Sequence, residues 1–162
     1  MHNVLVIIGL FLSYTAYCHT TGKVIRVIDG DTYELLVNSK KEVIRLANVD
    51  APEKDQTFGL VSKDSVSALV LNQIVILNYT GELTYNRKVA TLKVKGLELD
   101  SILVVKGWAW HFVAFSQKPQ LQTLQYQAQN NRKGLWHCPN PVPPWIWRKF
   151  SQFNKRLWNV CR

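Results

Sequence analysis

Short apolar runs separated by polar turn residues organise the N-terminal half of the chain. Runs rich in Val, Ile, Leu and Thr predict strands at residues 23–28, 32–37, 42–49, 74–77 and 89–94. Asp29-Gly30-Asp31 provides a tight turn between the first two, because Gly and Asp tolerate the backbone angles of such turns. Pro52 ends the third strand, since proline lacks the N–H that a sheet ladder needs. The pattern therefore predicts a three-stranded meander followed by two further strands.

The rest of the pattern predicts helices at residues 60–71, 97–105 and 120–131. Gly107 is placed to cap the second helix at its C-terminus. The polar stretches 81–82 and 85–88 predict a loop between the last two strands, and residues 141–147 predict an extended aromatic segment. Five short strands with a helix after the third favour an α+β fold that is mainly a β barrel. We expect a five-stranded OB-type Greek-key barrel with about three helices.

The N-terminus carries a separate signal. Residues 4–12 form an apolar run that is much shorter than the ~20 residues a membrane-spanning helix needs. Ala16-Tyr17-Cys18 follows as a cleavage tripeptide, although no Lys or Arg precedes the run. We expect a signal peptide at 1–18, one domain at 19–150 and a basic tail at 151–162. The protein is then secreted or periplasmic, without stable membrane association once the signal is removed.

Cleavage after Cys18 leaves two cysteines, Cys138 and Cys161. Disulfides persist in exported proteins, so a bridge between these two would fix the C-terminal tail. The alternative is that both stay free.

Charge narrows the range of partners. The net charge is +9, from 20 Lys and Arg against 11 Asp and Glu, and the pI is about 9.6. Such a balance in a small domain is typical of a protein that binds polyanions, and it is also compatible with a merely soluble basic surface. The cations near the C-terminus allow the same two interpretations; these are Arg148, Lys149, Lys155 and Arg156.

Acidic residues stand where the early strands end. Asp29 and Asp31 lie in the first turn, while Asp50 and Glu53 follow the strand that carries Arg45. Carboxylates beside an arginine at the end of a strand indicate a metal and a phosphate sharing one site. Taken alone, the first pair is equally typical of an ordinary turn, and Arg45 with Glu53 of a surface ion pair.

Three motifs together resemble the staphylococcal-type nuclease (thermonuclease) family. They are Val-Ile-Asp-Gly-Asp-Thr at 27–32, Ile-Arg-Leu-Ala-Asn-Val-Asp-Ala-Pro-Glu at 44–53 and Tyr-Asn-Arg at 85–87. Gly-Leu-Trp at 134–136 and Pro-Pro-Trp at 143–145 resemble the secreted or periplasmic bacterial branch. The resemblance covers about residues 22–150, and three motifs in the same order are far more specific than one.

The resemblance implies a Ca²⁺ site. Asp31 and Asp50 match the family's metal carboxylates, and Asp29 matches an acid that supports them. Ala51 stands where relatives often carry Thr, but the family's ligand at this position is the backbone carbonyl, which alanine retains. Ca²⁺ prefers oxygen ligands of this kind.

The resemblance also implies the residues that act on the phosphodiester. Arg45 and Arg87 match the arginines that grip phosphate, for which a planar guanidinium is better suited than lysine. Glu53 matches the proposed general base, which either takes a proton from the attacking water or mainly orders that water.

Tyr85 and Phe115 match positions of the wall that contacts the nucleotide. Phe115 belongs to an aromatic cluster with Trp108, Trp110 and Phe112, and neither Phe115 nor Val113 carries the hydroxyl that relatives often have there. These rings either stack on bases or fill space between barrel and helices.

The sequence therefore predicts a Ca²⁺-dependent endonuclease, a phosphodiester hydrolase that cleaves DNA and RNA as a monomer by metal-assisted attack of water. Specificity for sequence is expected to be low, because the groups identified contact phosphate. The alternative is a non-catalytic OB-fold module that binds nucleic acid, and a weaker one is an exported structural or adhesion protein. Retention of both metal carboxylates, both arginines and Glu53 favours the enzyme.

Overall fold

The computed structural model describes residues 19–116 and 118–158. The strands are β1 (Thr20–Val27), β2 (Thr32–Val37), β3 (Lys40–Leu46), β4 (Val49–Asp50), β5 (Ile74–Thr84), β6 (Arg87–Val94), β7 (Leu97–Glu98) and β8 (Trp110–His111). The helices are α1 (Gly59–Val70), α2 (Leu99–Lys106), α3 (Gln120–Asn130), α4 (Pro144–Trp147) and α5 (Gln152–Trp158), with short 3₁₀ turns at η1 (Val113–Phe115) and η2 (Gly134–His137).

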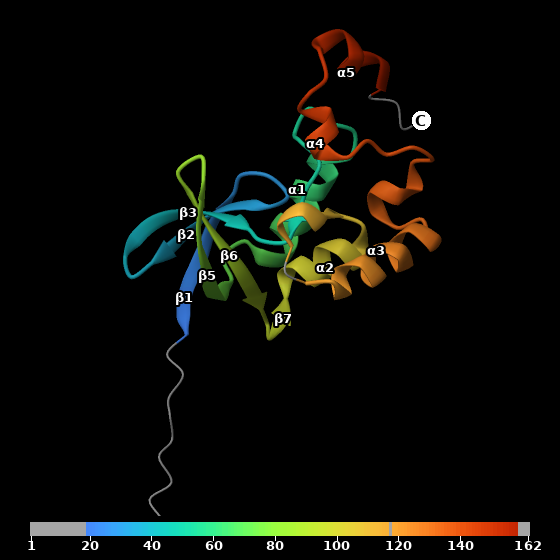
Figure 1. Cartoon of the computed structure of the whole chain (residues 1–162). Helices are drawn as coiled ribbons and strands as arrows, with labels where there is room; N and C mark the ends of the chain where they lie inside the picture. Colours follow the sequence, from blue (N-terminus) through green and yellow to red (C-terminus); the bar gives the residue numbers. More distant parts are fainter. Residues whose placement is uncertain (1–18, 117, 159–162) are drawn as a thin grey trace, which may run out of the picture.

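Five strands form a closed barrel, as the sequence predicts. They pair in the order β3-β2-β1-β5-β6, and β3 returns to pair in parallel with β6, so that Arg45 lies opposite Val89. All other pairs in the barrel are antiparallel. The barrel stands beside the helices α1 to α3, and α4 and α5 rise from the top of this body above α1 (Figure 1). Closure of the barrel fixes the start of β2 and the end of β3, near which the acidic residues lie.

Alternating side chains of the strands fill the barrel. Val24, Tyr33, Leu35 and Ile44 are completely buried, and Leu103 of α2 packs into the same core. Burying one such side chain contributes about 1.5–3 kcal/mol. Residues of the apolar runs that predicted the strands therefore form the core.

The prediction of a loop from the polar stretches 81–82 and 85–88 is wrong. Instead β5 continues to Thr84 and β6 begins at Arg87, so that only Tyr85 and Asn86 connect them. Both have positive φ, 48° and 63°, which is the geometry of a type I′ turn and matches the twist of a hairpin. The strands extend past their apolar residues because main-chain hydrogen bonds need no apolar side chains. Arg87 is thereby placed on a strand rather than on a flexible loop.

The segment expected to be extended at 141–147 is helical in its second half. Pro144 occupies the first turn of α4, a position where its missing N–H costs nothing. Trp147 at the end of α4 is 1% exposed and donates its indole N–H to Asp55 Oδ1 at 2.9 Å. We call residues 139–158 the C-terminal segment. It includes α4 and α5, two short helices beyond the three expected.

The expected signal peptide, Cys18 and Cys161 lie outside the described residues. Cys138 is disulfide-bonded. None of the helices in the described part of the chain has the length and apolar character needed to cross a membrane.

Candidate functional site

One partly buried arginine joins the two acidic segments. Arg45 Nη2 lies 3.1 Å from Asp31 Oδ2 and 3.0 Å from Asp50 Oδ1. Its Nη1 donates to the carbonyls of Leu46 and Val49 at 2.6 and 2.8 Å. The barrel explains this convergence. In the β2–β3 register Arg45 lies opposite the residue after Asp31, and the chain turns back after β3 to bring Asp50 alongside.

Asp31 is held tightly and is nearly inaccessible, with 5% exposure. Its Oδ2 accepts a hydrogen bond from the Ala51 N–H at 2.6 Å, and its own N–H donates to Asp29 Oδ1 at 3.1 Å. Burial raises the pKa of Asp31 to about 7, opposed by Arg45 and assisted by the charges of Asp29 and Asp50. The protein therefore compensates this charge only in part, which favours a cation at the site.

Gly30 allows the two acidic loops to touch. A Cβ at this position would lie 2.4 Å from Ser62 Oγ and 2.6 Å from the Ala51 Cβ, which is closer than real contacts. The Tyr33 hydroxyl also donates to the Gly30 carbonyl at 2.8 Å and closes the turn from the barrel side. The glycine of the motif is thus required by packing between the turn and Ala51.

Glu53 follows Pro52 and remains 36% exposed at its side chain. It is bound by Arg148, whose Nη1 donates to Glu53 Oε1 at 2.8 Å and to Asp50 Oδ1 at 3.2 Å. Arg148 Nη2 donates to Asp50 Oδ2 at 2.8 Å. The sequence placed Arg148 only among the general cations of the C-terminus. No local pattern identifies it, since it lies 95 residues from Glu53.

Arg87 reaches the acids through one hydroxyl. Its Nη1 donates to Thr32 Oγ1 at 3.1 Å, and Thr32 Oγ1 donates to Asp31 Oδ1 at the same distance. Its Nε donates to the Thr84 carbonyl at 3.2 Å, which fixes the guanidinium against the hairpin. Thr32 was not singled out from the sequence, although its place directly after the second acid of the turn is the available signal.

A recess of about 380 Å³ opens beside Arg45, lined by residues of β3, β5 and β6 together with Phe112 and Phe115. Phe115 is 66% exposed, and its ring centroid lies 4.9 Å from that of Phe112. Tyr85 is not part of this lining. It is 91% exposed, with its ring 5.9 Å from the Arg87 guanidinium.

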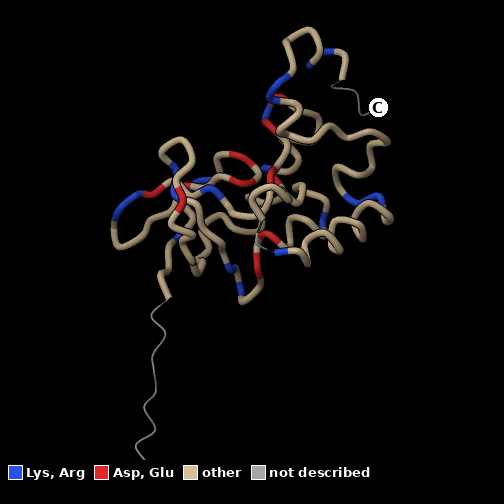
Figure 2. Tube along the Cα trace, viewed as in Figure 1, with Lys and Arg blue, Asp and Glu red and all other residues tan. Residues whose placement is uncertain are grey.

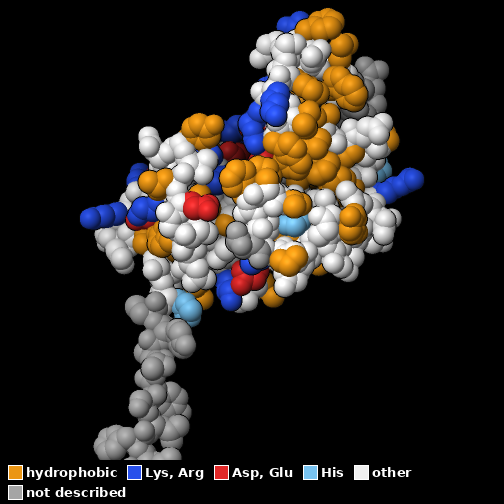
Figure 3. All heavy atoms as spheres, viewed as in Figure 1, with side chains coloured by type: hydrophobic (Ala, Val, Ile, Leu, Met, Phe, Trp, Pro, Cys, Tyr) orange, Lys and Arg blue, Asp and Glu red, His pale blue; other side chains and the backbone are white. Residues whose placement is uncertain are grey.

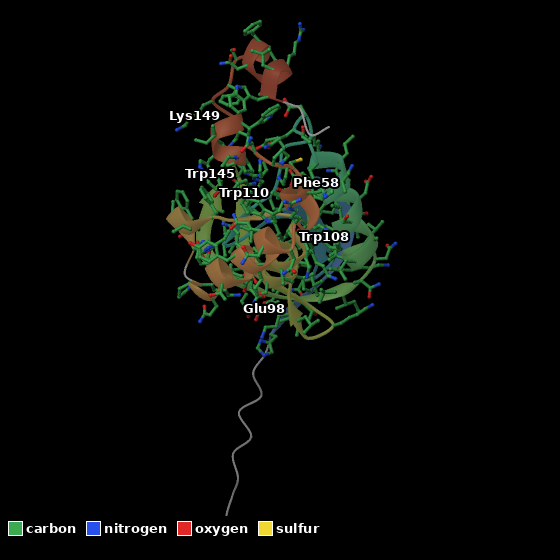
Figure 4. All side chains as sticks on the ribbon, turned by 90° about the vertical axis from the view of Figure 1, so that its right-hand side faces the viewer. Phe58, Glu98, Trp108, Trp110, Trp145 and Lys149 are labelled. Carbon is green, nitrogen blue, oxygen red and sulfur yellow. The ribbon has the colours of Figure 1, made fainter. Side chains whose placement is uncertain are left out.

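The aromatic cluster expected from the sequence divides into two groups. Trp108 packs against the main core, and Trp110 packs against Trp136 with ring centroids 4.3 Å apart. Phe112 instead stacks on Trp145 of α4 at 5.3 Å and 17°. Figure 4 shows Trp145 and Trp110 side by side beneath α4. The space-filling role therefore applies to Trp108 and Trp110, while the two phenylalanines border the recess.

The oxygen donors suit a hard cation better than a soft one. Within the described ranges no three His, Cys, Asp or Glu side chains converge as a ready-made metal site. The side-chain oxygen donors here are the buried carboxylates of Asp31 and Asp50. The backbone carbonyl of Ala51, the residue after Asp50, is a further oxygen donor in the chain. Ca²⁺ completes such partial sets with carbonyl oxygens and water, whereas soft metals need nitrogen or sulfur ligands. The arrangement therefore fits a hydrated hard cation next to Arg45.

Replacing Asp31 by asparagine is expected to stabilise the protein in chelator at pH 8. The free energy of unfolding should rise by about 1–3 kcal/mol, because the asparagine amide keeps an acceptor for the Ala51 N–H and removes a buried charge. The raised pKa of Asp31, about 7 against an ordinary 3.8, sets the pH window. The advantage should grow as the pH rises from about 4 to about 7, and it should vanish below about pH 4, where the carboxyl is protonated in both the folded and the unfolded chain.

Urea unfolding followed by circular dichroism at pH 8 and pH 4 measures this difference. Asp64→Asn, at an exposed position of α1, is the matched control and should change little. An Asp31→Asn protein less stable than the wild type at pH 8 would contradict the prediction.

Comparison with known proteins agrees with this geometry. Residues 43–138 match a family model described as "Staphylococcal nuclease homologue". An "Uncharacterized endonuclease" of Escherichia coli O157:H7 is 39% identical over 128 residues, which cover 78% of this chain and 84% of the relative. A "Micrococcal nuclease" of Shigella flexneri is 32% identical over 154 residues, covering 88% of each chain. An "Uncharacterized endonuclease" of Haemophilus influenzae is 34% identical over 151 residues, covering 93% of this chain and 85% of the relative.

Proposed function

We propose that this chain, which belongs to the staphylococcal nuclease family and is a nuclease, is a Ca²⁺-dependent endonuclease. Its substrates are DNA and RNA, cleaved with little sequence preference. The observation that carries the proposal is a single guanidinium, that of Arg45, which lies within 3.1 Å of Asp31 and 3.0 Å of Asp50. Glu53 and Arg87 border the same pair of carboxylates through one intervening group each. Anionic substrate also suits the net charge of +9.

The carboxylates and the arginines have separate roles: the carboxylates bind the cation, and the arginines bind the phosphodiester. Asp31, Asp50 and the Ala51 carbonyl would hold a divalent cation, which would supply neutralisation of the phosphate oxygens and polarisation of a water. Asp29 fixes Asp31 by accepting its backbone N–H. Arg45 and Arg87 bind the phosphodiester, for which the guanidinium fork is suited. Because both guanidinium groups are already held by protein oxygens, little ordering is left for the substrate to induce.

Hydrolysis forms one phosphorus–oxygen bond, breaks another, removes a proton from water and delivers a proton to the leaving oxygen. Water attacks phosphorus and its proton passes to Glu53, either directly or through ordered water. The bond from phosphorus to the 5′-oxygen breaks, and Arg87 stabilises the charge on that oxygen as it leaves. The 5′-oxygen then takes a proton from solvent water. Products then carry a 3′-phosphate and a 5′-hydroxyl. Sequence specificity is low because these groups all act on phosphate.

The recess beside Arg45 is the place for a base. Phe115 at its rim presents an exposed ring, and stacking on an aromatic ring contributes about 1–3 kcal/mol per base. Tyr85 lies at the Arg87 end of the site, where its ring supports that guanidinium. Phe115→Ala is therefore expected to raise KM more than it lowers kcat, and an unchanged KM would remove Phe115 from the substrate site.

Digestion of single-stranded DNA and of RNA, each with Ca²⁺ and with chelator, tests the proposed function. Cleavage only with Ca²⁺, giving products with 3′-phosphate ends, is the expected result. Equal survival of the nucleic acid with Ca²⁺ and with chelator would contradict Ca²⁺-dependent cleavage. Binding of the nucleic acid without cleavage would favour the non-catalytic OB-fold module. Replacing Ca²⁺ by Mg²⁺ or Mn²⁺ identifies the ion.

We also propose that the mature protein acts in a secreted or periplasmic location after loss of residues 1–18. The apolar run at 4–12 supports this. N-terminal sequencing of protein recovered from an export-competent host is the measurement, and an intact Met1 would contradict it.

A further inference from the structure

Arg148 lies directly on the carboxylates assigned to cation and water. Its two terminal nitrogens bind both oxygens of Asp50, at 3.2 Å to Oδ1 and 2.8 Å to Oδ2, and one of them also binds Glu53 at 2.8 Å. The Asp50 side chain is only 2% exposed, whereas that of Arg148 is 46% exposed. Arg148 therefore covers the site from the solvent side. Figure 3 shows acidic side chains in a recess below basic ones at the base of the C-terminal projection.

Contacts of neighbouring residues hold Arg148 over the site in the arrangement observed. Trp147, directly before it, is buried and donates to Asp55, and Lys155 of α5 forms an ion pair with the same carboxylate at 2.7 Å. The Gln56 side chain donates to the Val142 carbonyl at the other end of α4. These contacts tie the C-terminal segment to the loop that follows β4. Figure 2 shows its basic positions next to the acidic positions of that loop.

A cation and Arg148 need the same oxygens. Asp50 Oδ1 accepts hydrogen bonds from Arg45 and from Arg148, and Asp50 Oδ2 accepts one from Arg148. Three of the about four lone-pair sites of the Asp50 carboxylate are therefore filled. A divalent cation at the remaining site on Oδ2 would lie next to the Arg148 guanidinium, and the two positive charges repel each other. The Arg45 side chain is only 13% exposed and is held by two backbone carbonyls, so it is not free to leave. Arg148 is half exposed on a terminal segment, so it is the group that can move.

We propose that Arg148 gates the cation site: the C-terminal segment and a divalent cation compete for Asp50 and Glu53, and cation binding requires Arg148 to withdraw. The inference rests on the proposed function in assigning Asp50 to the cation. In the closed arrangement Arg148 neutralises Asp50 and Glu53 and blocks Asp50. In the open arrangement both carboxylates face the cation and its water. The segment thus sets the cation concentration at which the nuclease becomes competent.

Direct cation binding tests the gate without reference to activity. Calorimetric titration of Ca²⁺ into the full chain compares the wild type with Arg148→Ala and Lys149→Ala. Lys149 is the matched control, because it has the same charge, is the next residue, and is exposed with its side chain directed away from the body (Figure 4). We expect Arg148→Ala to tighten Ca²⁺ binding by about tenfold and Lys149→Ala by less than about twofold. Equal tightening in both variants would mean a general charge effect and would overturn the gate, as would unchanged or weaker binding in Arg148→Ala.

A second variant loosens the segment without changing any charge. Trp147→Phe removes the N–H that Asp55 accepts, so it should also tighten Ca²⁺ binding, by about two- to fivefold given that other contacts of the segment remain. In the Arg148→Ala background it should have no further effect. Tightening of the same size in that background would show that Trp147 acts independently of Arg148, and would overturn the coupling proposed between them.

Different experimental results would overturn the gate and the nuclease mechanism. Tighter Ca²⁺ binding in Arg148→Ala by a protein that cleaves neither DNA nor RNA would leave the gate standing and overturn the nuclease mechanism. Ca²⁺-dependent cleavage with equal Ca²⁺ affinity in wild type and Arg148→Ala would do the reverse. Circular dichroism of each variant in chelator establishes that the fold is intact before either comparison.

Discussion

Glu53→Gln is expected to lower kcat by about 10²–10⁴-fold, the usual contribution of a general base. The amide keeps an oxygen that can accept from Arg148, so the contact at 2.8 Å can persist in weaker form. It cannot take a proton from water at neutral pH. KM for single-stranded DNA should change by less than about threefold, since Glu53 is not assigned to phosphate binding. Steady-state kinetics with a fluorescent oligonucleotide at saturating Ca²⁺ measures both constants.

Asp64→Asn is the control for this variant, because it also removes one carboxylate charge at an exposed position, on α1. It should leave kcat unchanged. A loss of binding in Glu53→Gln as large as the loss of kcat would contradict the role as base. It would instead indicate that Glu53 has a structural role, in which it holds Arg148 and the loop that follows β4.

Arg87→Ala should lower kcat by about 10²–10³-fold, the range seen when one donor to a developing oxyanion is removed. The side chain bridges the hairpin and Thr32 and contributes little to the core, so the circular dichroism spectrum should not change. Arg87→Lys should recover only part of the activity, because an ammonium cannot reproduce the two-pronged contact with phosphate.

Lys88→Ala is the matched control for Arg87. Lys88 is the next residue on β6 but pairs with Glu42 at 2.7 Å rather than with the site. Its loss should change kcat by less than about twofold, as expected for an exposed ion pair. Full activity in Arg87→Lys, or similar small effects in Arg87→Ala and Lys88→Ala, would remove Arg87 from the transition state.

The gate adds a condition to both kinetic experiments. If Arg148 competes with Ca²⁺, activities compared at low Ca²⁺ mix changes in chemistry with changes in cation occupancy. Comparisons therefore belong at saturating Ca²⁺, where binding to the folded state is complete and the remaining difference lies in turnover.

The elements that the sequence predicted well are those specified by residues close together in the chain. The turn at Gly30 and the cap at Gly107 each follow from the backbone preferences of one residue. The third strand, expected at 42–49 and ended by Pro52, instead ends at Leu46 before a turn at Asn48 with φ 68°, and Val49–Asp50 forms the separate strand β4. The hairpin at Tyr85-Asn86 was missed because its strands are held by main-chain hydrogen bonds beyond the last apolar residues. Amino-acid pattern carries little information about such pairing.

The residue pattern was enough to specify the barrel and the charged residues at the end of β3, because alternating apolar positions define the buried face and the register of β2 on β3 follows from it. The folded chain was needed to place Thr32 between Arg87 and Asp31, and to separate the aromatic residues that border the recess from those that fill the core. Folding also brings Arg148 onto Asp50, 98 residues away. That contact depends on where Trp147 is buried against Asp55. Packing between distant segments is decided by the shape of the whole core, and neither periodicity nor motif spacing encodes it.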